Sequence, residues 1–188
     1  MLSAQIDDDY KSLRRYFQKL FEVLAQELKE YQSAPVEAVD LTTPESQATY
    51  FRISHFIKPD MLINIYGLVD FWLKKICDHQ MTKNNLSLRH SDIKGRDDLH
   101  AYHKYLTQYL GLDLAMVKAS YDRLQQLREI RNRFIHHGGH VPDDEKSIKR
   151  ISAITGIGLS GSLIVIGEDF VWDLLDCAKK YLCAAAVA

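Results

Sequence analysis

The apolar residues near the N-terminus constrain the fold most strongly, because they recur at the spacing of an α-helix. Successive apolar positions are three or four residues apart, and they are Tyr10, Leu13, Phe17, Leu20, Leu24, Leu28 and Tyr31. This pattern predicts a long amphipathic helix of about seven turns. The acidic run Asp7–Asp9 just before it is typical of a helix start, where the positive end of the helix dipole favours carboxylates.

Five further segments carry helical patterns, and one segment predicts strands. The expected helices cover residues 44–57, 59–79, 97–109, 113–137 and 168–188, although the aromatic and β-branched residues of 50–57 leave a strand open there. Residues 150–157 and 163–166, joined by a Gly- and Ser-rich stretch, predict a β-hairpin. We therefore predict an all-α, up-and-down helical bundle in a single domain of 188 residues, with a small β-hairpin insertion at about 150–167 before the last helix.

The stretch from Leu127 to Gly139 is unusual, because a charge interrupts its helical stripe. The two steps of that stripe after Leu127 are Arg131 and Phe134, and the apolar positions before it are Val117, Tyr121 and Leu124. A charge in a row of core positions is costly unless it is paired, so Arg131 needs a specific role. The glycine pair Gly138–Gly139 predicts the end of the helix.

Arg131, Asn132 and His136 are the candidate catalytic residues. A guanidinium can hold a phosphate through two hydrogen bonds, and an imidazole can transfer a proton near neutral pH. His136 and His137 lie in the last turn of the predicted helix, where the negative end of the dipole favours a protonated imidazole. Five residues advance an ideal helix by about 140°. Arg131 and His136 are thus expected to flank a groove that a second helix, or a second copy of this one, has to close.

The segment Arg131-Asn132-Arg133-Phe134-Ile135-His136 resembles the R-x(4–6)-H signature of the HEPN superfamily, and Asn132 matches the polar residue that follows the arginine there. The resemblance covers about Met61 to Gly139, together with the final helix by its place in the topology. It implies an all-α domain, and many members of the superfamily are metal-independent RNases that act as toxins or antiviral defence effectors. The segment from Val141 to Gly167 does not obviously belong to it.

The resemblance also implies a reaction and its partners. The ribose 2′-hydroxyl would attack the neighbouring phosphorus of RNA and leave a 2′,3′-cyclic phosphate, with His136 as general base or general acid. Arg131 would stabilise charge on the non-bridging oxygens, and Asn132 would orient the phosphate or the histidine. His137 fits the same spacing range as His136. No metal or other cofactor is implied, and the implied partners are RNA, a second copy of the chain in a homodimer, and a nucleotidyltransferase-type antitoxin.

The composition indicates a local basic patch in a chain without a basic excess. The formal net charge is −1, so no overall field attracts nucleic acid. Arg128, Arg133 and His137 are the predicted substrate contacts beside the candidate catalytic residues. The three cysteines have no C-x-x-C spacing, which fits a reducing cytosol. No apolar run is long enough to cross a bilayer, so we expect a cytoplasmic protein with no membrane partner.

Asp70 is the acidic counterpart of Arg131, because it lies in a line with Tyr66, Leu73 and Cys77 on its own predicted helix. We predict that the two helices pack together and that Asp70 meets Arg131 or Asn132. The alternative is that Asp70 lies at the edge of its apolar stripe and reaches water.

Other functions stay open on the sequence alone. A HEPN-like fold could bind RNA or nucleotides without cleavage, or the chain could be a structural or dimer-interface domain in which Arg131 and Asp70 form a buried pair. A metal is not expected, although His100 and His103, with Asp97, have a spacing that could hold zinc.

Overall fold

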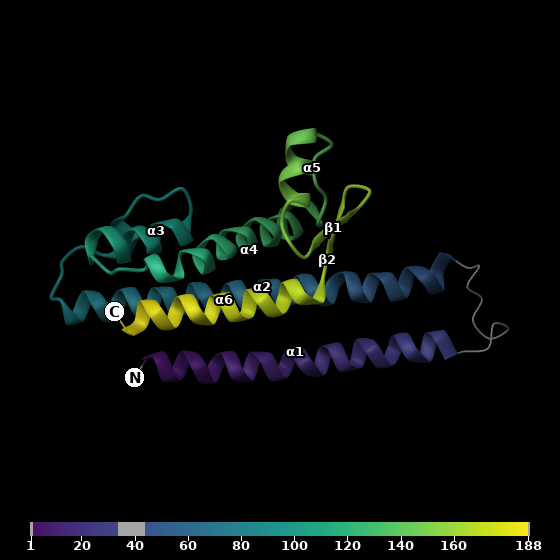
Figure 1. Ribbon diagram of the computed structural model, residues 1–188, viewed down its shortest axis with the longest axis horizontal. Helices are drawn as coiled ribbons and strands as arrows, with labels where there is room; N and C mark the ends of the chain where they lie inside the picture. The colour runs from purple at the N-terminus through teal and green to yellow at the C-terminus, as the bar shows by residue number, and fades with distance from the viewer. Residues whose placement is uncertain (1, 34–43, 188) are drawn as a thin grey trace.

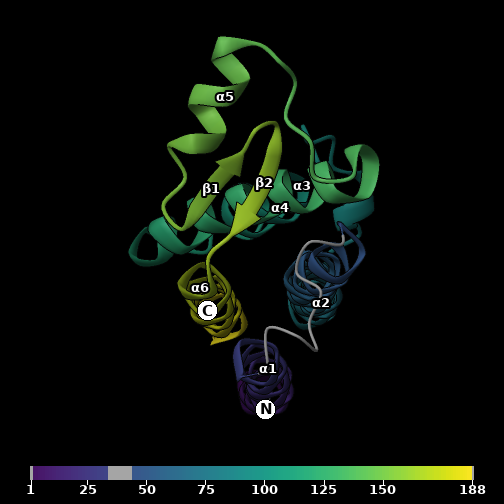
Figure 2. The same cartoon turned by 90° about the vertical axis from the view of Figure 1, so that its right-hand side faces the viewer.

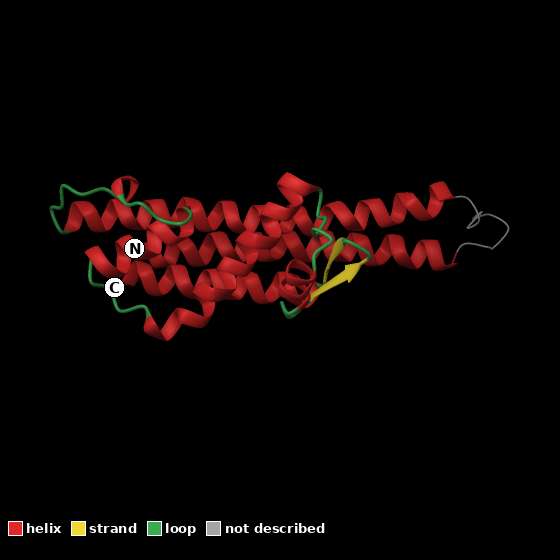
Figure 3. Cartoon of the chain, turned by 90° about the horizontal axis from the view of Figure 1, so that it is seen from above, coloured by secondary structure: helices red, strands yellow, loops and turns green. Residues whose placement is uncertain are grey.

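The computed structural model describes residues 2–33 and 44–187, with side chains described for 2–26, 29 and 56–187. That part of the chain contains six α-helices and one antiparallel hairpin, and their bounds are α1 Leu2–Ser33, α2 Pro44–Lys83, α3 Asp98–Lys104, α4 Lys118–His137, α5 Glu145–Ser152, β1 Ile157–Ser160, β2 Leu163–Ile166 and α6 Glu168–Val187. Short helical turns cover His90–Asp92, Tyr105–Tyr109 and Ala115–Val117. Figure 3 shows how little of the described chain is strand. The prediction of a helical fold with one hairpin before the last helix is confirmed.

The long helices run up and down along the longest axis of the molecule, with α1 and α4 in one direction and α2 and α6 in the other (Figure 1). Viewed end-on, α2 and α6 lie side by side between α1 and the layer that contains α3 and α4 (Figure 2). Helix α6 packs against α1, α2 and α4. Within the described residues, no helix has both the length and the apolar character needed to cross a membrane.

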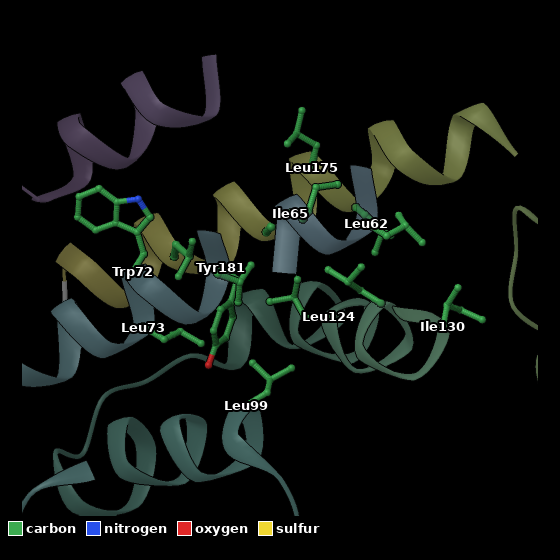
Figure 4. Close-up of a cluster of buried hydrophobic side chains, with 14 of the residues drawn as sticks. Leu62, Ile65, Trp72, Leu73, Leu99, Leu124, Ile130, Leu175 and Tyr181 are labelled. Atoms are coloured by element: carbon green, nitrogen blue, oxygen red, sulfur yellow. The ribbon is translucent and has the colours of Figure 1, made fainter. Parts of the chain in front are cut away.

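The centre of the core lies where α2, α4 and α6 meet. Figure 4 shows Leu62 and Ile65 of α2, Leu124 and Ile130 of α4, and Leu175 of α6 gathered at this junction. All five side chains are at most 1% exposed. Burying a leucine or isoleucine completely stabilises a fold by about 1.5–3 kcal/mol, so this junction fixes how α4 is presented to solvent.

Helix α1 has the predicted apolar face but begins earlier than predicted. Tyr10, Phe17 and Leu24 are buried, whereas the side chains of Leu28 and Tyr31 lie outside the described residues. The helix starts at Leu2 and not at the acidic run Asp7–Asp9. The reason is packing, because Ile6 is fully buried and extends the apolar face by one turn. Asp7 instead pairs with Lys11 of its own helix and Lys179 of α6.

Helix α2 is continuous through Pro59, where the sequence predicted a break between two helices, and residues 50–57 are helical and not a strand. An internal proline removes one backbone hydrogen bond and costs about 3 kcal/mol. Tertiary packing offsets this cost, because Pro59, Met61 and Leu62 are all buried. Lys58 also donates a hydrogen bond of 2.9 Å from Nζ to the carbonyl of Ile166, which ties α2 to the hairpin.

The hairpin is shorter than predicted, because a helix occupies the start of its expected first strand. Asp144 caps α5 by accepting a 2.8 Å hydrogen bond from the Ser147 amide, and α5 continues to Ser152 with Ile151 fully buried. Strand β1 therefore begins only at Ile157, which pairs with Ile166. Helix α5 and the hairpin lie over the C-terminal end of α4 in Figure 1.

Candidate functional site

Helix α4 contains Arg131, Asn132 and His136, which match the R-x(4–6)-H signature. Its buried face differs from the predicted one at a single position, the one that follows Leu127. The buried residues of α4 are Ser120, Leu124, Leu127 and Ile130. Ile130 therefore takes the core position that the spacing assigned to Arg131, because the row advances from Leu127 by three residues and not by four. Arg131 is half-buried at the edge of this face, and Phe134 packs partly buried against the core.

Helix α4 ends at the predicted glycine pair. Gly138 adopts a positive φ of 58° and donates its N–H to the carbonyl of Arg133, so it caps the helix in the left-handed conformation. Gly139 follows with a φ of 82°, and a Cβ placed there would lie 2.5 Å from a ring carbon of Phe134. Both glycines are therefore required by the local backbone, and the second is also required by packing.

The hairpin holds the chain directly after α4. The Val141 amide donates to the carbonyl of Ser162 at 2.8 Å, and the Ile164 amide donates to the carbonyl of Gly139 at 3.0 Å. The His140 ring adds a hydrogen bond of 2.9 Å between Nδ1 and Ser162 Oγ. The segment that the sequence left without a role therefore fixes the position of the last turn of α4.

The solvent-facing side of α4 forms one wall of a cavity of about 530 Å³. Two residues from other segments complete it, Arg96 from the loop before α3 and Arg150 from α5. The full lining is Arg96, Gln125, Gln126, Arg128, Glu129, Asn132, Arg133, His136, His137 and Arg150. The structure thus brings five of the predicted site residues together, namely Arg128, Asn132, Arg133, His136 and His137.

Positive charge dominates this cavity, since four arginines and one glutamate line it. Arg150 Nη2 lies 2.8 Å from Glu129 Oε1. Arg96 and Arg128 both approach Asp97, whose side chain is only 3% exposed. The lining therefore keeps an excess of cationic side chains in a chain whose net charge is −1, which favours an anionic ligand.

Arg131 is not among the residues that line this cavity. Its guanidinium carbon lies 5.1 Å from the centre of the Tyr66 ring on α2, and its Nη1 donates a 2.8 Å hydrogen bond to Asn132 Oδ1. Its Nε is buried without a hydrogen-bond partner in the described chain. Within one chain, Arg131 therefore reaches the cavity of His136 only indirectly, through Asn132.

Among the described residues, Arg131 contacts Tyr66 and forms no ion pair with Asp70. Helices α2 and α4 do pack together as predicted, but the residue of α2 under Arg131 is Tyr66, one turn before Asp70. Asp70 is exposed, in agreement with the alternative that it reaches water.

Burial raises the pKa of Tyr102, and the nearby Asp70 carboxylate raises it further. Burial likewise raises the pKa of Tyr66, to about 12.

Four histidines were candidates for catalysis, substrate contact or metal binding, and they form two pairs. His136 and His137 are exposed at the cavity, with ring centres 6.4 Å apart. His100 and His103 instead contact tyrosines: His100 Nδ1 lies 3.3 Å from the Tyr121 hydroxyl and His103 Nδ1 lies 2.8 Å from the Tyr181 hydroxyl. Burial lowers the pKa of His103. The described residues contain no group of three or more His, Cys, Asp or Glu side chains that could hold a metal ion.

Sequence reasoning missed several residues of the cavity. Glu129 lies one turn and Gln125 two turns before Arg133 on the same helix face, so helical spacing alone could have found them. Arg96 and Arg150 come from segments outside α4, and nothing in their local sequence indicates that they reach it. Comparisons with models of protein families, with curated proteins and with solved structures found no match for the chain.

Proposed function

We propose that this chain is a metal-independent endoribonuclease of the HEPN type, which binds RNA in the cavity on α4. The observation that carries the proposal is the composition of the lining, in which four arginines, one asparagine and two histidines surround one face of a helix. Cationic side chains in a groove bind the phosphates of a nucleic acid, and two imidazoles can supply the acid and the base of a proton-transfer reaction.

The geometry gives each motif residue a role in this proposal. A guanidinium can only donate hydrogen bonds, so the contact of Arg131 with Asn132 directs the amide oxygen toward Arg131 and leaves the amide N–H groups for a phosphate. His136 follows Asn132 by one turn on the same side of α4 and lines the same cavity. Arg131 is then a positioning residue, whereas the resemblance alone implied direct contact with the phosphate.

In the proposed reaction, one imidazole accepts the proton of the ribose 2′-hydroxyl as the 2′-oxygen bonds to phosphorus. The bond from phosphorus to the 5′-oxygen breaks, and the second imidazole donates a proton to that oxygen. The products are a 2′,3′-cyclic phosphate and a free 5′-hydroxyl. His136 and His137 are both exposed at the cavity and are the two candidates for these steps.

The test is cleavage of a labelled oligoribonucleotide in the presence of a chelator. We expect cyclic-phosphate products from RNA and none from DNA of the same sequence, because DNA lacks the 2′-hydroxyl. His136→Ala or His137→Ala should lower the rate by about 10²–10⁴-fold. His79→Ala is the matched control, since His79 is exposed on α2 and outside the cavity lining. Cleavage that needs an added divalent metal would overturn the proposal.

A second copy of the chain belongs to the proposal, because a large apolar side chain is exposed on α4 one turn after Arg131. Ile135 follows Arg131 by one turn and is 44% exposed. Association through this edge of α4 would cover an apolar side chain and bring partner residues next to Arg131. Sedimentation equilibrium should show a dimer for the wild type and a monomer for Ile135→Glu, with cleavage lost in the variant.

One observation favours a second candidate function, RNA binding without cleavage. In the described part of the chain, the imidazoles of His136 and His137 make no hydrogen bond, whereas a catalytic base is usually oriented by a third group. The same assay separates the two functions. Binding of the oligoribonucleotide that depends on the cavity arginines, with no product after prolonged incubation, would favour the second.

A further inference from the structure

Arg96 is an exposed arginine that is nevertheless held in place at both ends of its guanidinium group. Its side chain is 72% exposed, and its Nε donates to Asp97 Oδ2 at 3.2 Å. Its Nη2 donates to Gln125 Oε1 at 3.0 Å. Gln125 is itself fixed, because its Nε2 donates to the Tyr121 hydroxyl at 2.9 Å. These contacts orient a side chain that would otherwise sample many rotamers.

Arg128 approaches the same carboxylate from α4. Its Nη1 lies 3.3 Å from Asp97 Oδ2, and its side chain is 28% exposed. The other oxygen of Asp97 is already used, because Oδ1 accepts the His100 amide at the start of α3. One largely buried carboxylate therefore holds two guanidinium groups, and both of these groups line the cavity.

The charges at this point do not balance. Two guanidinium groups share one carboxylate oxygen, so these three side chains together carry a net positive charge. Arg96 keeps Nη1 free for a ligand after its contacts with Asp97 and Gln125, and Arg128 keeps Nε and Nη2 after its contact with Asp97. Oriented N–H donors with unbalanced positive charge favour a phosphate group, which accepts two-point contacts from arginine.

We propose that Arg96 and Arg128, positioned by Asp97, form a phosphate subsite separate from the histidine end of the cavity. Arg128 precedes His136 by eight residues, which is about 12 Å along a helix. At about 3.4 Å per nucleotide of a stacked strand, this separation corresponds to roughly three nucleotides. This inference rests on the proposed function. It implies that the substrate is an RNA strand of at least about three nucleotides, and that Arg96 and Arg128 bind a phosphate distant from the bond that is cleaved.

The first experiment tests the subsite without RNA. Inorganic phosphate is titrated into the protein while the arginine Nε–H signals are followed by NMR. We expect the Arg96 and Arg128 signals to shift in a saturable way, and the signal of Arg15 to stay constant. Arg15 is exposed on α1, and Figure 1 and Figure 2 show that helix α1 lies on the opposite side of the bundle from α4. Equal small shifts in all three would overturn the subsite.

The second experiment measures binding of oligoribonucleotides to His136→Ala protein, which keeps the strand intact. Adding Arg96→Gln, which alters an exposed side chain, should weaken binding of a hexanucleotide about tenfold. It should also reduce the slope of log affinity against log salt by about 0.7, while Arg15→Gln changes neither. A dinucleotide, too short to reach the subsite, should be insensitive to Arg96→Gln.

The outcomes separate this inference from the proposed function. Saturable phosphate shifts at Arg96 and Arg128 without any RNA cleavage by the wild type would support the subsite and contradict the ribonuclease. RNA cleavage with a hexanucleotide affinity unchanged by Arg96→Gln would support the ribonuclease and overturn the subsite. An equal loss of dinucleotide and hexanucleotide binding would also overturn it, because the arginine would then act at the histidine end.

Discussion

Replacing Gly139 by alanine should destabilise the end of the motif helix by two separate effects. Gly139 has a φ of 82°, and the left-handed region costs a residue with a Cβ about 1–2 kcal/mol. The new Cβ would also lie 2.5 and 2.9 Å from two ring carbons of Phe134. Relieving that overlap costs about 1–3 kcal/mol. The free energy of unfolding should therefore fall by about 3 kcal/mol, which lowers Tm by roughly 6–12 °C in a chain of this size.

Gly161→Ala is the matched control, since Gly161 also has a positive φ of 60° but a Cβ there meets no atom within 4 Å. It should show the conformational cost alone, about 1–2 kcal/mol. Both variants are compared with the wild type by urea denaturation and thermal melting. A double variant with Phe134→Leu should be less than additive, because a smaller side chain relieves the overlap. The reasoning is refuted if Gly139→Ala is no less stable than Gly161→Ala.

The surroundings of Arg131, Asp144 and His103 each predict a measurable change in stability or activity. Arg131→Met keeps the apolar stem over Tyr66 and removes a buried Nε that has no acceptor. The free energy of unfolding measured with urea should therefore change by less than about 1 kcal/mol. RNA cleavage should be lost. Asp144→Ala removes the cap of α5 and should cost about 1 kcal/mol in thermal melts, whereas Asp144→Asn costs much less. Burial lowers the pKa of His103 in the folded chain below its ordinary value of 6.5. As the pH falls from 6.5 toward the folded-state pKa, His103 therefore binds more protons in the unfolded chain than in the folded chain. The free energy of unfolding declines in that pH window. His103→Gln should flatten this decline in stability below about pH 6.5 in denaturation experiments.

The periodicity of apolar residues predicted the helices better than their ends. Tyr10, Phe17 and Leu24 are buried as their spacing predicts, because a helix of this length must place one face against its neighbours. The capping signals were less reliable. Asp97 does cap α3, but the acidic run Asp7–Asp9 lies inside α1. A carboxylate that can pair with lysines is stable within a helix, so an acidic run does not by itself mark a start.

Part of the candidate site was predictable because it lies on one helix. Asn132 and His136 are four residues apart, and any α-helix places them on one side. The position of Arg131 was not predictable, since it depends on whether Ile130 or Arg131 faces the core, and that choice is made by the packing of α2 against α4. The contribution of Arg96 depends on a contact with Gln125, 29 residues away, which no local pattern encodes.

The pairing of residues 139–141 with the hairpin means that the last turn of α4 is not an independent helix end. The amides of Val141 and Ile164 bond across this junction, and Lys58 fastens the other end of β2 to α2. Opening the C-terminal turn should therefore require opening the hairpin as well, so both form one cooperative unit. In hydrogen–deuterium exchange, these two amides should therefore show the same free energy of opening, and a ligand that immobilises either one should protect both.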